Sequence, residues 1–501
     1  MKLALILFAA ATVWELLLWT SFAWPRRKWL ASPLVPGLAV TSELLFASHP
    51  SGWTALVALF TIYRIVNLLR LIEGRTQNDY LFQTTRKTAL WLLGLQLLMG
   101  AGGLANHQLQ LSTASWWYLL AAAQILAALV LALSTRRHLR TTGAPGNAKA
   151  FADKDLPSLT VAIPARNETD DLEACLKSLV ASDYPKLEII VLDDCSQVKR
   201  TPEIIREFAH DGVRFLAGKV PPERWLAKNY AYQQLSEAAS GKLLLFCGVD
   251  VRFEATSLRA MVETLLTKKK AMISFIPRNI LPGRWTIEQL LVQASRYAWE
   301  LSLPRRLFQR PPVLSTSWLI TAEALHAAGG FKAVASSSSI ESYFAQQLIR
   351  QNDGYSFLQS SPVIGLTSAK SFEEQRFTAL RLRYPQLHRR PELVGLVSLL
   401  ELASLLLPFA QTIGFVVTRQ WLLAGFSALT AALLISFYSR VMALTYRHFL
   451  IRGLWLLPFA AMYDVGLLNY SMVQYEFGEV LWKGRNVCIP VMRVFSSLPK
   501  G

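Results

Sequence analysis

The chain has 501 residues and carries 52 Lys and Arg against 34 Asp and Glu, which gives a formal net charge of +18. Apolar residues make up 52% of it and charged residues 17%, whereas a soluble globular chain usually has about 25% charged residues. The apolar content excludes a disordered chain, and four cysteines are too few for a disulfide scaffold. The composition therefore predicts a membrane protein with a water-facing part.

The positive charge is unevenly distributed along the chain. Residues 157–390 carry a net charge of +7, and the remaining residues carry +11. Most of the excess thus flanks the apolar runs, a pattern that favours contact with the anionic lipid of a bilayer. We expect no nucleic-acid partner.

Residues 1–140 contain five apolar runs, which predict an N-terminal membrane region of about five spans. The short loops after the first, third and fifth run are basic, while the loops after the second and fourth contain no Lys or Arg. The positive-inside rule then places the N-terminus outside and everything after Ser134 in the cytoplasm. No small-residue cleavage site follows the first run, so it is interpreted as a retained span. The runs are Leu3–Phe22, Pro33–Ser48, Trp53–Ile72, Thr88–Asn106 and Ser115–Ser134.

A polar linker at residues 141–156 separates these runs from a segment of different pattern. From residue 157 to residue 391, short apolar strands alternate with amphipathic helices such as Asp170–Ala181 and Thr201–His210. This alternation predicts an α/β domain with a mostly parallel sheet and helices on both faces. The expected strands are Leu159–Ile163, Leu187–Leu192, Val213–Leu216, Lys242–Phe246 and Ala271–Ile276.

Apolar runs return in residues 392–478, at Leu393–Val417, Trp421–Tyr438 and Leu454–Val473, followed by a basic tail at residues 479–501. Three full crossings cannot join two cytoplasmic ends. We therefore expect two spans plus one interfacial or re-entrant segment, for which Leu393–Pro408 is the candidate because Pro408 interrupts it. The tail is expected to be cytoplasmic.

Polar residues follow three of the expected strands, at the edge where open α/β sheets bind ligands. The loop after the first strand can present backbone N–H groups and Arg166 to a diphosphate, and Glu168 can accept from a base or ribose. Adjacent carboxylates after the second strand can hold a uracil edge or ribose hydroxyls. The acid after the fourth lies where a metal-bound diphosphate would be. Ordinary strand–helix turns remain the alternative. The residues are Pro164, Ala165, Arg166, Asn167, Glu168, Asp193, Asp194 and Asp250.

In this order and spacing, the three strand ends resemble the family-2 glycosyltransferases of the GT-A fold, over about residues 157–390. The stretch Val220–Ala231 is similar to one in membrane enzymes that glycosylate hopanoids, carotenoids and ceramide, and the resemblance brings Lys228 to the donor phosphates; the alternative is a solvated helix charge. Further matches fall on Glu341 and Ser342, where the family has a Glu-Asp pair, on Arg383 and Tyr384, and on the C-terminal Trp482 and Arg485.

Three departures from the family pattern fall on catalytic positions. Gly248 replaces the first acid of the Asp-x-Asp motif, so only Asp250 remains to bind a metal such as Mg²⁺ or Mn²⁺. Ser342 replaces the expected base, and serine cannot act as a base at neutral pH without a partner. Leu380 replaces the first polar residue of the motif that also contains Arg383 and Tyr384, which is called the terminal motif below.

Two interpretations therefore stay open. In an active enzyme, Glu341 takes the role of base, and Asp250 with Lys228, Arg166 and Arg383 carries the charge of the diphosphate. In a catalytically silent protein, the domain binds a nucleotide-sugar or a partner without transferring sugar. A processive polysaccharide synthase is a further, less favoured alternative.

Residues 282–312 interleave aromatic and basic side chains among leucines, which is typical of an amphipathic segment in the headgroup region. Such a segment would admit a lipid acceptor from the membrane. The alternative is a core helix with a basic outer face. The interfacial candidates are Trp285, Trp299, Arg305, Arg306, Trp482 and Arg485.

The resemblance implies an inner-membrane, multi-pass glycosyltransferase whose GT-A domain is inserted between two membrane bundles. It implies a nucleoside-diphosphate sugar donor, UDP-linked by expectation, and a lipid or isoprenoid acceptor, with inversion at the anomeric carbon. The N-terminal spans exceed what this chemistry needs, so we expect them to bind a protein partner or to shape an acceptor channel.

Overall fold

The computed structural model of the chain describes residues 2–20, 28–73, 79–109, 113–142, 149–223, 225–280, 287–302, 311–337, 339–351, 354–446 and 450–487. These residues form two compact units. The helical unit comprises residues 1–124, 386–427 and 468–478, and the α/β unit comprises residues 125–385, 428–467 and 479–501. Three long helices, α5, α17 and α19, contribute residues to both units, and the last residue of α14 also belongs to the helical unit.

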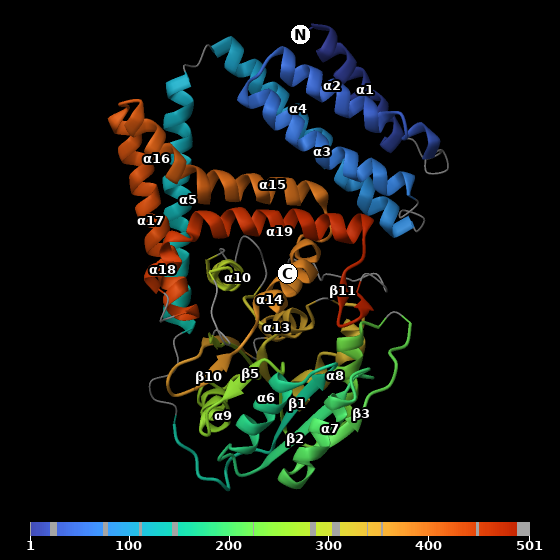
Figure 1. Cartoon of the computed structure of the whole chain (residues 1–501), viewed down its shortest axis with the longest axis vertical. Helices are drawn as coiled ribbons and strands as arrows, with labels where there is room; N and C mark the ends of the chain where they lie inside the picture. Colours follow the sequence, from blue (N-terminus) through green and yellow to red (C-terminus); the bar gives the residue numbers. More distant parts are fainter. Residues whose placement is uncertain are drawn as a thin grey trace. The chain divides into compact units, whose positions relative to one another are not determined.

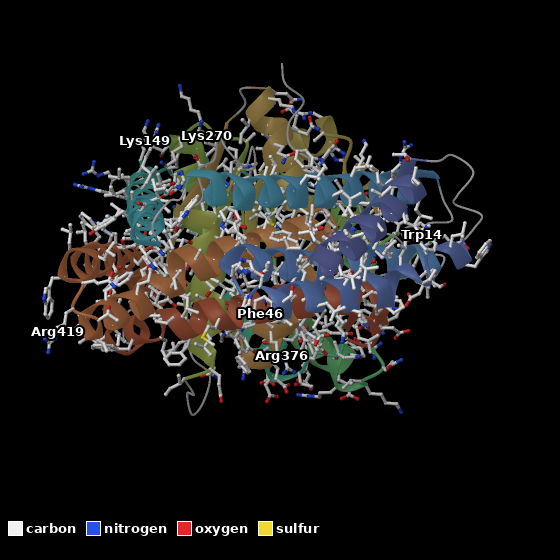
Figure 2. All side chains as sticks on the ribbon, turned by 90° about the horizontal axis from the view of Figure 1, so that it is seen from above. Trp14, Phe46, Lys149, Lys270, Arg376 and Arg419 are labelled. Atoms are coloured by element: carbon white, nitrogen blue, oxygen red, sulfur yellow. The ribbon has the colours of Figure 1, made fainter. Side chains whose placement is uncertain are left out.

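The helical unit is built from long apolar helices. Neighbours in the chain contact one another from α1 to α4, and α15 contacts α3. Because the polar backbone is satisfied within each helix, apolar side chains can face outward, as Trp14 and Phe46 do (Figure 2). The helices of this unit are α1 (Lys2–Thr20), α2 (Leu34–Ser48), α3 (Gly52–Ile72), α4 (Asp79–Leu109), α15 (Pro391–Glu401) and α16 (Leu407–Val417), with parts of α5 (Thr113–Thr142), α17 (Trp421–Thr445) and α19 (Leu457–Phe477).

Five described helices are long and apolar enough to cross a membrane, which indicates a membrane protein. They are Leu3–Thr20, Gly52–Ile72, Ala114–Arg140, Pro391–Val417 and Trp421–Thr445. The expected run at Pro33–Ser48 forms α2, a shorter apolar helix, and the run at Thr88–Asn106 lies within α4. The span number and the topology of the membrane regions stay predictions.

The segment Pro391–Val417 changes direction inside its length. A π-helical stretch, Leu402–Leu406, separates α15 from α16, and Pro408 follows it. Figure 1 shows α15 and α16 running in clearly different directions. A π-bulge and a proline are both recognised causes of such kinks. The expectation that Leu393–Pro408 lies in the interface or re-enters the membrane stays a prediction.

The α/β unit is organised around a seven-stranded sheet with the order β3-β2-β1-β4-β8-β6-β9. Strands β1, β2 and β3 of this sheet are labelled in Figure 1. Strand β8 runs antiparallel to both of its neighbours, and the other pairs are parallel. The α/β prediction is confirmed, and each expected strand is present within two residues of its bounds. The strands are β1 (Leu159–Ala165), β2 (Leu187–Asp193), β3 (Val213–Ala217), β4 (Leu243–Cys247), β6 (Met272–Ile276), β8 (Ser317–Thr321) and β9 (Tyr355–Gln359).

Helices cover both faces of this sheet, as expected. Alternate residues of β1 point to opposite sides, so Val161 and Ile163 join one apolar cluster and Ala162 joins the other. The first cluster includes residues of α6 (Asp170–Val180), α7 (Arg200–Glu207) and α9 (Ser257–Thr267). The second includes residues of α8 (Ala227–Ala238) and α13 (Ile340–Arg350), around the buried Trp318.

Two smaller β-structures lie in the same unit. A three-stranded sheet has the order β5-β10-β7, with β5 at Val251–Phe253, β10 at Leu366–Ser368 and β7 at Arg278–Asn279. An antiparallel hairpin, β11 (Leu481–Trp482) and β12 (Arg485–Asn486), follows α19 and is called the C-terminal hairpin below. Both structures supply side chains to the candidate site.

Candidate functional site

The carboxyl ends of β1 and β2 are aligned, which brings their two polar loops together. Ala165 is paired with Asp193 in the parallel register. Arg166 Nη1 donates to the backbone oxygens of Asp194 and Cys195, at 2.6 and 2.7 Å. Asn167 accepts from the backbone N–H of Gln197 at 2.8 Å. The Arg166 and Asn167 side chains therefore hold the two loops against each other.

The C-terminal hairpin binds the same sheet edge. Arg166 Nε donates to the Lys483 backbone oxygen at 3.0 Å, and the Lys483 ammonium pairs with Glu168. Arg485 Nη1 donates to Asp194 Oδ2 at 2.7 Å. Two carboxylates that the resemblance assigned to the donor are thus paired with cations of the chain itself.

Burial and these cations act in opposite directions on the two carboxylates. Burial raises the pKa of Asp194, and the Arg485 and Arg166 guanidinium groups partly offset that rise. Burial likewise raises the pKa of Glu168, against the lowering effect of Lys483. The net effect is a raised pKa for both groups, so the paired cations offset only part of the effect of burial.

A cavity of about 110 Å³ lies beside these residues, between the sheet edge and two helices. Lys228, in the first turn of α8, and Glu341, in the first turn of α13, both line it. Arg381 of α14 (Phe372–Gln386) lines it as well, together with Arg485 from the C-terminal hairpin. A carboxylate and three cationic side chains from distant parts of the sequence thus converge on one space.

Asn229 fixes the two helices that frame this cavity. Its side-chain amide donates to the backbone oxygens of Val334 and Ser337, both at 2.8 Å, and of Ala335 at 3.1 Å. These oxygens belong to the loop that precedes α13. Asn229 is only 3% exposed, so it links the start of α8 to the segment that presents Glu341.

The surroundings of Lys228 lower the pKa of its ammonium group. The pKa of Lys228 is lowered to about 8, chiefly by burial, with Arg381 and Lys370 acting in the same direction and Glu341 and Asp250 against it. Its ammonium also lies 5.3 Å from the centre of the Tyr232 ring. The side chain is therefore a partly buried cation whose charged form would be favoured by a nearby negative charge, as a donor phosphate would supply.

Asp250 lies at the end of β4 and is held by residues of β10 and the loop after it. Its Oδ2 accepts from Ser368 Oγ at 2.8 Å and lies 3.7 Å from Lys370 Nζ. Burial raises the pKa of Asp250, but Lys370, the Ser368 hydrogen bond and Lys228 together lower it below its ordinary value. Asp250 is therefore ionised and already faces a cation.

This arrangement does not fit a divalent metal. Magnesium and manganese prefer oxygen ligands, and the Asp250 carboxylate already has a lysine ammonium beside it. At position 248, where the motif has its first acid, an added Cβ would collide with Asp250 Oδ1, so a side chain there would require the Asp250 carboxylate to move. No cluster of three His, Cys, Asp or Glu residues suited to a metal occurs in the described part of the chain.

The predicted pair Arg383 and Tyr384 is not among the residues that line the cavity. Arg383 forms an ion pair with Asp464 of α19, and its guanidinium carbon lies 4.8 Å from the centre of the Trp299 ring. Trp299 Nε1 donates to the same Asp464 carboxylate at 3.1 Å. Tyr384 is fully buried. Arg381, two residues earlier on the same helix, lines the cavity instead.

The other predicted residues divide into three groups. Ser342 is buried next to Glu341, and its hydroxyl has no hydrogen-bond partner among the described residues. Arg485, expected at the acceptor or membrane interface, lines the cavity and pairs with Asp194. Trp285, Arg305, Arg306 and the Trp482 side chain lie outside the described residues.

The sequence interpretation missed Asn229, Ser368, Lys370, Arg381 and Lys483. Lys370 and Ser368 precede α14 and match no part of the motifs. Arg381 could have been found, because it lies inside the terminal motif between Leu380 and Arg383. Lys483 could also have been found, because it lies between Trp482 and Arg485, the two C-terminal residues that matched the family.

Part of this unit is similar to known proteins. Residues 160–329 match the family "Glycosyl transferase family 2". A probable glycosyltransferase, YdaM of Bacillus subtilis (strain 168), is 33% identical over 122 residues, which are 24% of this chain and 29% of that protein. Glycosyltransferase AglE of Haloferax volcanii is 32% identical over 114 residues, 22% of this chain and 36% of that protein. The chain thus spans about a third of the length of these relatives.

Solved structures are similar at a lower level. A mannosyltransferase of Pyrobaculum calidifontis, in complex with GDP-Man and Mn²⁺, is 17% identical, with a TM-score of 0.42, over 72% of this chain and 97% of that one. S. aureus TarS, residues 1–349 with UDP-GlcNAc, is 15% identical, with a TM-score of 0.31, over 64% and 91%.

Residues 160–329 therefore match a family 2 glycosyltransferase domain, and they lie in a unit with an α/β fold and a mixed sheet. The two relatives are glycosyltransferases over this part, which agrees with the predicted transferase class. The narrower resemblance to ceramide, hopanoid and carotenoid glycosyltransferases stays a prediction.

Proposed function

We propose that the protein is an inverting glycosyltransferase of the cell membrane, which moves a sugar from a nucleoside-diphosphate sugar to a lipid or isoprenoid acceptor. Family 2 membership of residues 160–329 supports the nucleotide-sugar donor. Five helices of membrane-spanning length support a membrane location and an acceptor that reaches the site from lipid.

One observation carries this proposal: Glu341 shares a cavity with Lys228 and Arg381. A glycosyl transfer with inversion needs a carboxylate beside the acceptor hydroxyl and positive charge beside the leaving diphosphate. The cavity contains both kinds of group, and Glu341 is the acid among its lining residues. Asn229 keeps the elements that carry Lys228 and Glu341 in register.

The reaction then proceeds as a single displacement. Glu341 takes the proton of the acceptor hydroxyl while its oxygen attacks the anomeric carbon on the face opposite the diphosphate. The bond between that carbon and the diphosphate oxygen breaks, and its electron pair remains on the diphosphate. Lys228 and Arg381 stabilise this charge. The products are the inverted glycoside and the nucleoside diphosphate, with the proton on Glu341.

The membrane face, the nucleotide of the donor and the task of the N-terminal spans are proposed from the family resemblance. We place the catalytic domain on the cytoplasmic face of an inner membrane, with a UDP-sugar as the donor. The N-terminal spans then bind a protein partner or shape the path of the acceptor.

The main alternative is a protein that binds a nucleotide-sugar without transferring sugar. The specific observation in its favour is that Ser342 replaces the expected acid, while Arg485 and Lys483 pair with two donor-side carboxylates. A processive polysaccharide synthase is less favoured, because Arg383 pairs with Asp464 instead of lining the cavity.

A transfer assay separates these functions. Full-length protein in nanodiscs is incubated with radiolabelled UDP-sugars and a membrane-lipid extract. The proposal expects release of UDP, labelled lipid, and loss of both in Glu341→Gln with nucleotide binding retained. Nucleotide binding without turnover, unchanged by Glu341→Gln, would instead establish the silent protein. Label in a water-soluble polymer would point to the synthase.

A further inference from the structure

The ion pair between Asp250 and Lys370 is built into the backbone of the α/β unit. Ser368 and Lys370 flank Ala369, whose N–H donates to the Asp250 backbone oxygen at 2.8 Å. Strand β10 also pairs with β5, with Ser368 opposite Val251. The chain on both sides of the ion pair is thus fixed by backbone hydrogen bonds, so Lys370 does not reach Asp250 from a free loop.

The carboxylate has little freedom to serve another cation. Asp250 is 8% exposed, and its Oδ2 accepts from Ser368 at 2.8 Å with the Lys370 ammonium at 3.7 Å. Its Oδ1 lies above Gly248, in space that a Cβ at that position would occupy. The glycine therefore makes room for the position that the Asp250 carboxylate adopts.

We propose that Lys370 takes the place of a divalent metal, so that the site binds and releases a nucleoside diphosphate without a bound metal. The inference rests on the proposed function, because it assumes a nucleoside-diphosphate sugar as the donor. The Lys370 ammonium is a compact cation with three donors: one faces Asp250, and the other two can bind oxygens of the diphosphate.

The charge balance agrees with this assignment. A metal at this point would bring two positive charges to the diphosphate. Lys370 brings one positive charge. Lys228 and Arg381, which line the same cavity, bring two more, and both Arg381 and Lys370 act electrostatically on Lys228. When the bond to the anomeric carbon breaks, the electron pair that stays on the diphosphate is stabilised by these three fixed cations.

The test measures nucleotide binding and turnover separately. Binding of UDP and GDP to full-length protein in nanodiscs is measured by calorimetry, in excess EDTA and in millimolar MnCl₂. We expect the same Kd in both buffers for the wild type. Lys370→Met is expected to weaken binding about tenfold or more in either buffer, because it removes a charge-assisted contact.

A second variant tests the substitution of metal by lysine directly. Lys370→Glu places a carboxylate beside Asp250, the ligand type that Mn²⁺ prefers. We expect its binding to be weak in EDTA and to recover in MnCl₂. The matched control is Lys177→Met, which removes an exposed lysine paired with Glu173 and is expected to change neither Kd nor melting temperature. Thermal unfolding of each variant checks that it is folded.

Each other outcome overturns the inference. Wild-type binding that requires Mn²⁺ contradicts it, as does unchanged binding in Lys370→Met or the absence of binding in both buffers. Turnover distinguishes its failure from that of the proposed function. Sugar transfer that depends on metal leaves the function standing and refutes the inference. Metal-independent binding without transfer supports the inference and refutes the function.

Discussion

Arg485 Nη1 donates a 2.7 Å hydrogen bond to Asp194 Oδ2, although the two residues are 291 positions apart in the chain. The neighbouring Lys483 pairs with Glu168. Through these contacts, residues that follow α19 complete the edge of the sheet at the carboxyl ends of β1 and β2. The α/β unit is therefore not closed until the C-terminal hairpin is in place.

Removal of Arg485 is expected to destabilise the protein. Arg485→Ala leaves the Asp194 carboxylate, 4% exposed, without its partner, at a cost of about 2 kcal/mol. The control is Arg200→Ala, which breaks an exposed pair with Glu207 and should change the melting temperature much less. Melting temperatures in detergent, followed by tryptophan fluorescence, measure both.

The destabilisation of Arg485→Ala is also expected to depend on pH. Arg485 lowers the pKa of Asp194 against the effect of burial, so its removal raises that pKa further. A carboxyl group whose pKa is raised on folding favours the folded state when it is protonated. The difference in melting temperature from the wild type should therefore shrink as the pH falls from 7 towards 5. A difference that grows in this direction would contradict the pairing.

Glu341→Gln is expected to lower kcat by about 10² to 10⁴-fold, because the amide cannot take the acceptor proton. Donor binding should change little, since the amide has nearly the same shape as the carboxylate that it replaces. Ser342→Ala is the adjacent control: its hydroxyl has no partner in the described structure, so kcat and stability should stay close to those of the wild type. Initial rates of UDP release test both. A Glu341→Gln variant with normal kcat would remove Glu341 from the mechanism.

Donor affinity should fall as the pH rises above about 8. Burial lowers the pKa of Lys228 to about 8, so its ammonium is present at pH 7 and lost progressively at higher pH. A bound diphosphate favours the charged form, which shifts the loss to a somewhat higher pH in the complex. Lys228→Arg keeps its charge and should flatten the dependence of Kd on pH between 7 and 9. An equally steep dependence in Lys228→Arg would assign it to another group.

Asp464→Asn is expected to destabilise the α/β unit by about 1 to 3 kcal/mol, because Arg383 loses its ionised partner in a buried place. Trp299 Nε1 still finds an acceptor in the asparagine oxygen, so the tryptophan should keep its position. The kcat should fall as well, since α14 carries both Arg383 and the cavity residue Arg381. Thermal unfolding and UDP release measure these effects. A stable, fully active Asp464→Asn would contradict them.

The strands were predictable because their residues carry a local signal. Leu159–Ile163 and Leu187–Leu192 are apolar runs between polar loops, and the structure extends them only to Ala165 and Asp193. Strand β9 at Tyr355–Gln359 was not expected. It is short and carries polar residues at Ser356 and Gln359, so only its pairing with β6 reveals it.

The partners of charged residues were not predictable, because they depend on contacts between distant parts of the sequence. Nothing near Arg64 shows that it is buried with Glu15 and Gln96 in the helical unit. In the same way, Lys370 matches no motif. Its ion pair with Asp250 is visible only in the structure, where β10 pairs with β5. Local motifs indicated Lys228 and Glu341 but not the Asn229 contacts that hold them together.

Asp194 pairs with Arg485, and Glu168 pairs with Lys483, so both carboxylates are held by the C-terminal hairpin. A ligand that needs either carboxylate must therefore displace the cation that is paired with it. Because the hairpin is part of the same chain, it competes at an effective concentration set by its tether and not by its abundance. The measured affinity of such a ligand is therefore lower than its affinity for a site without the hairpin. Diluting the protein does not change this difference, because the hairpin stays attached to the chain.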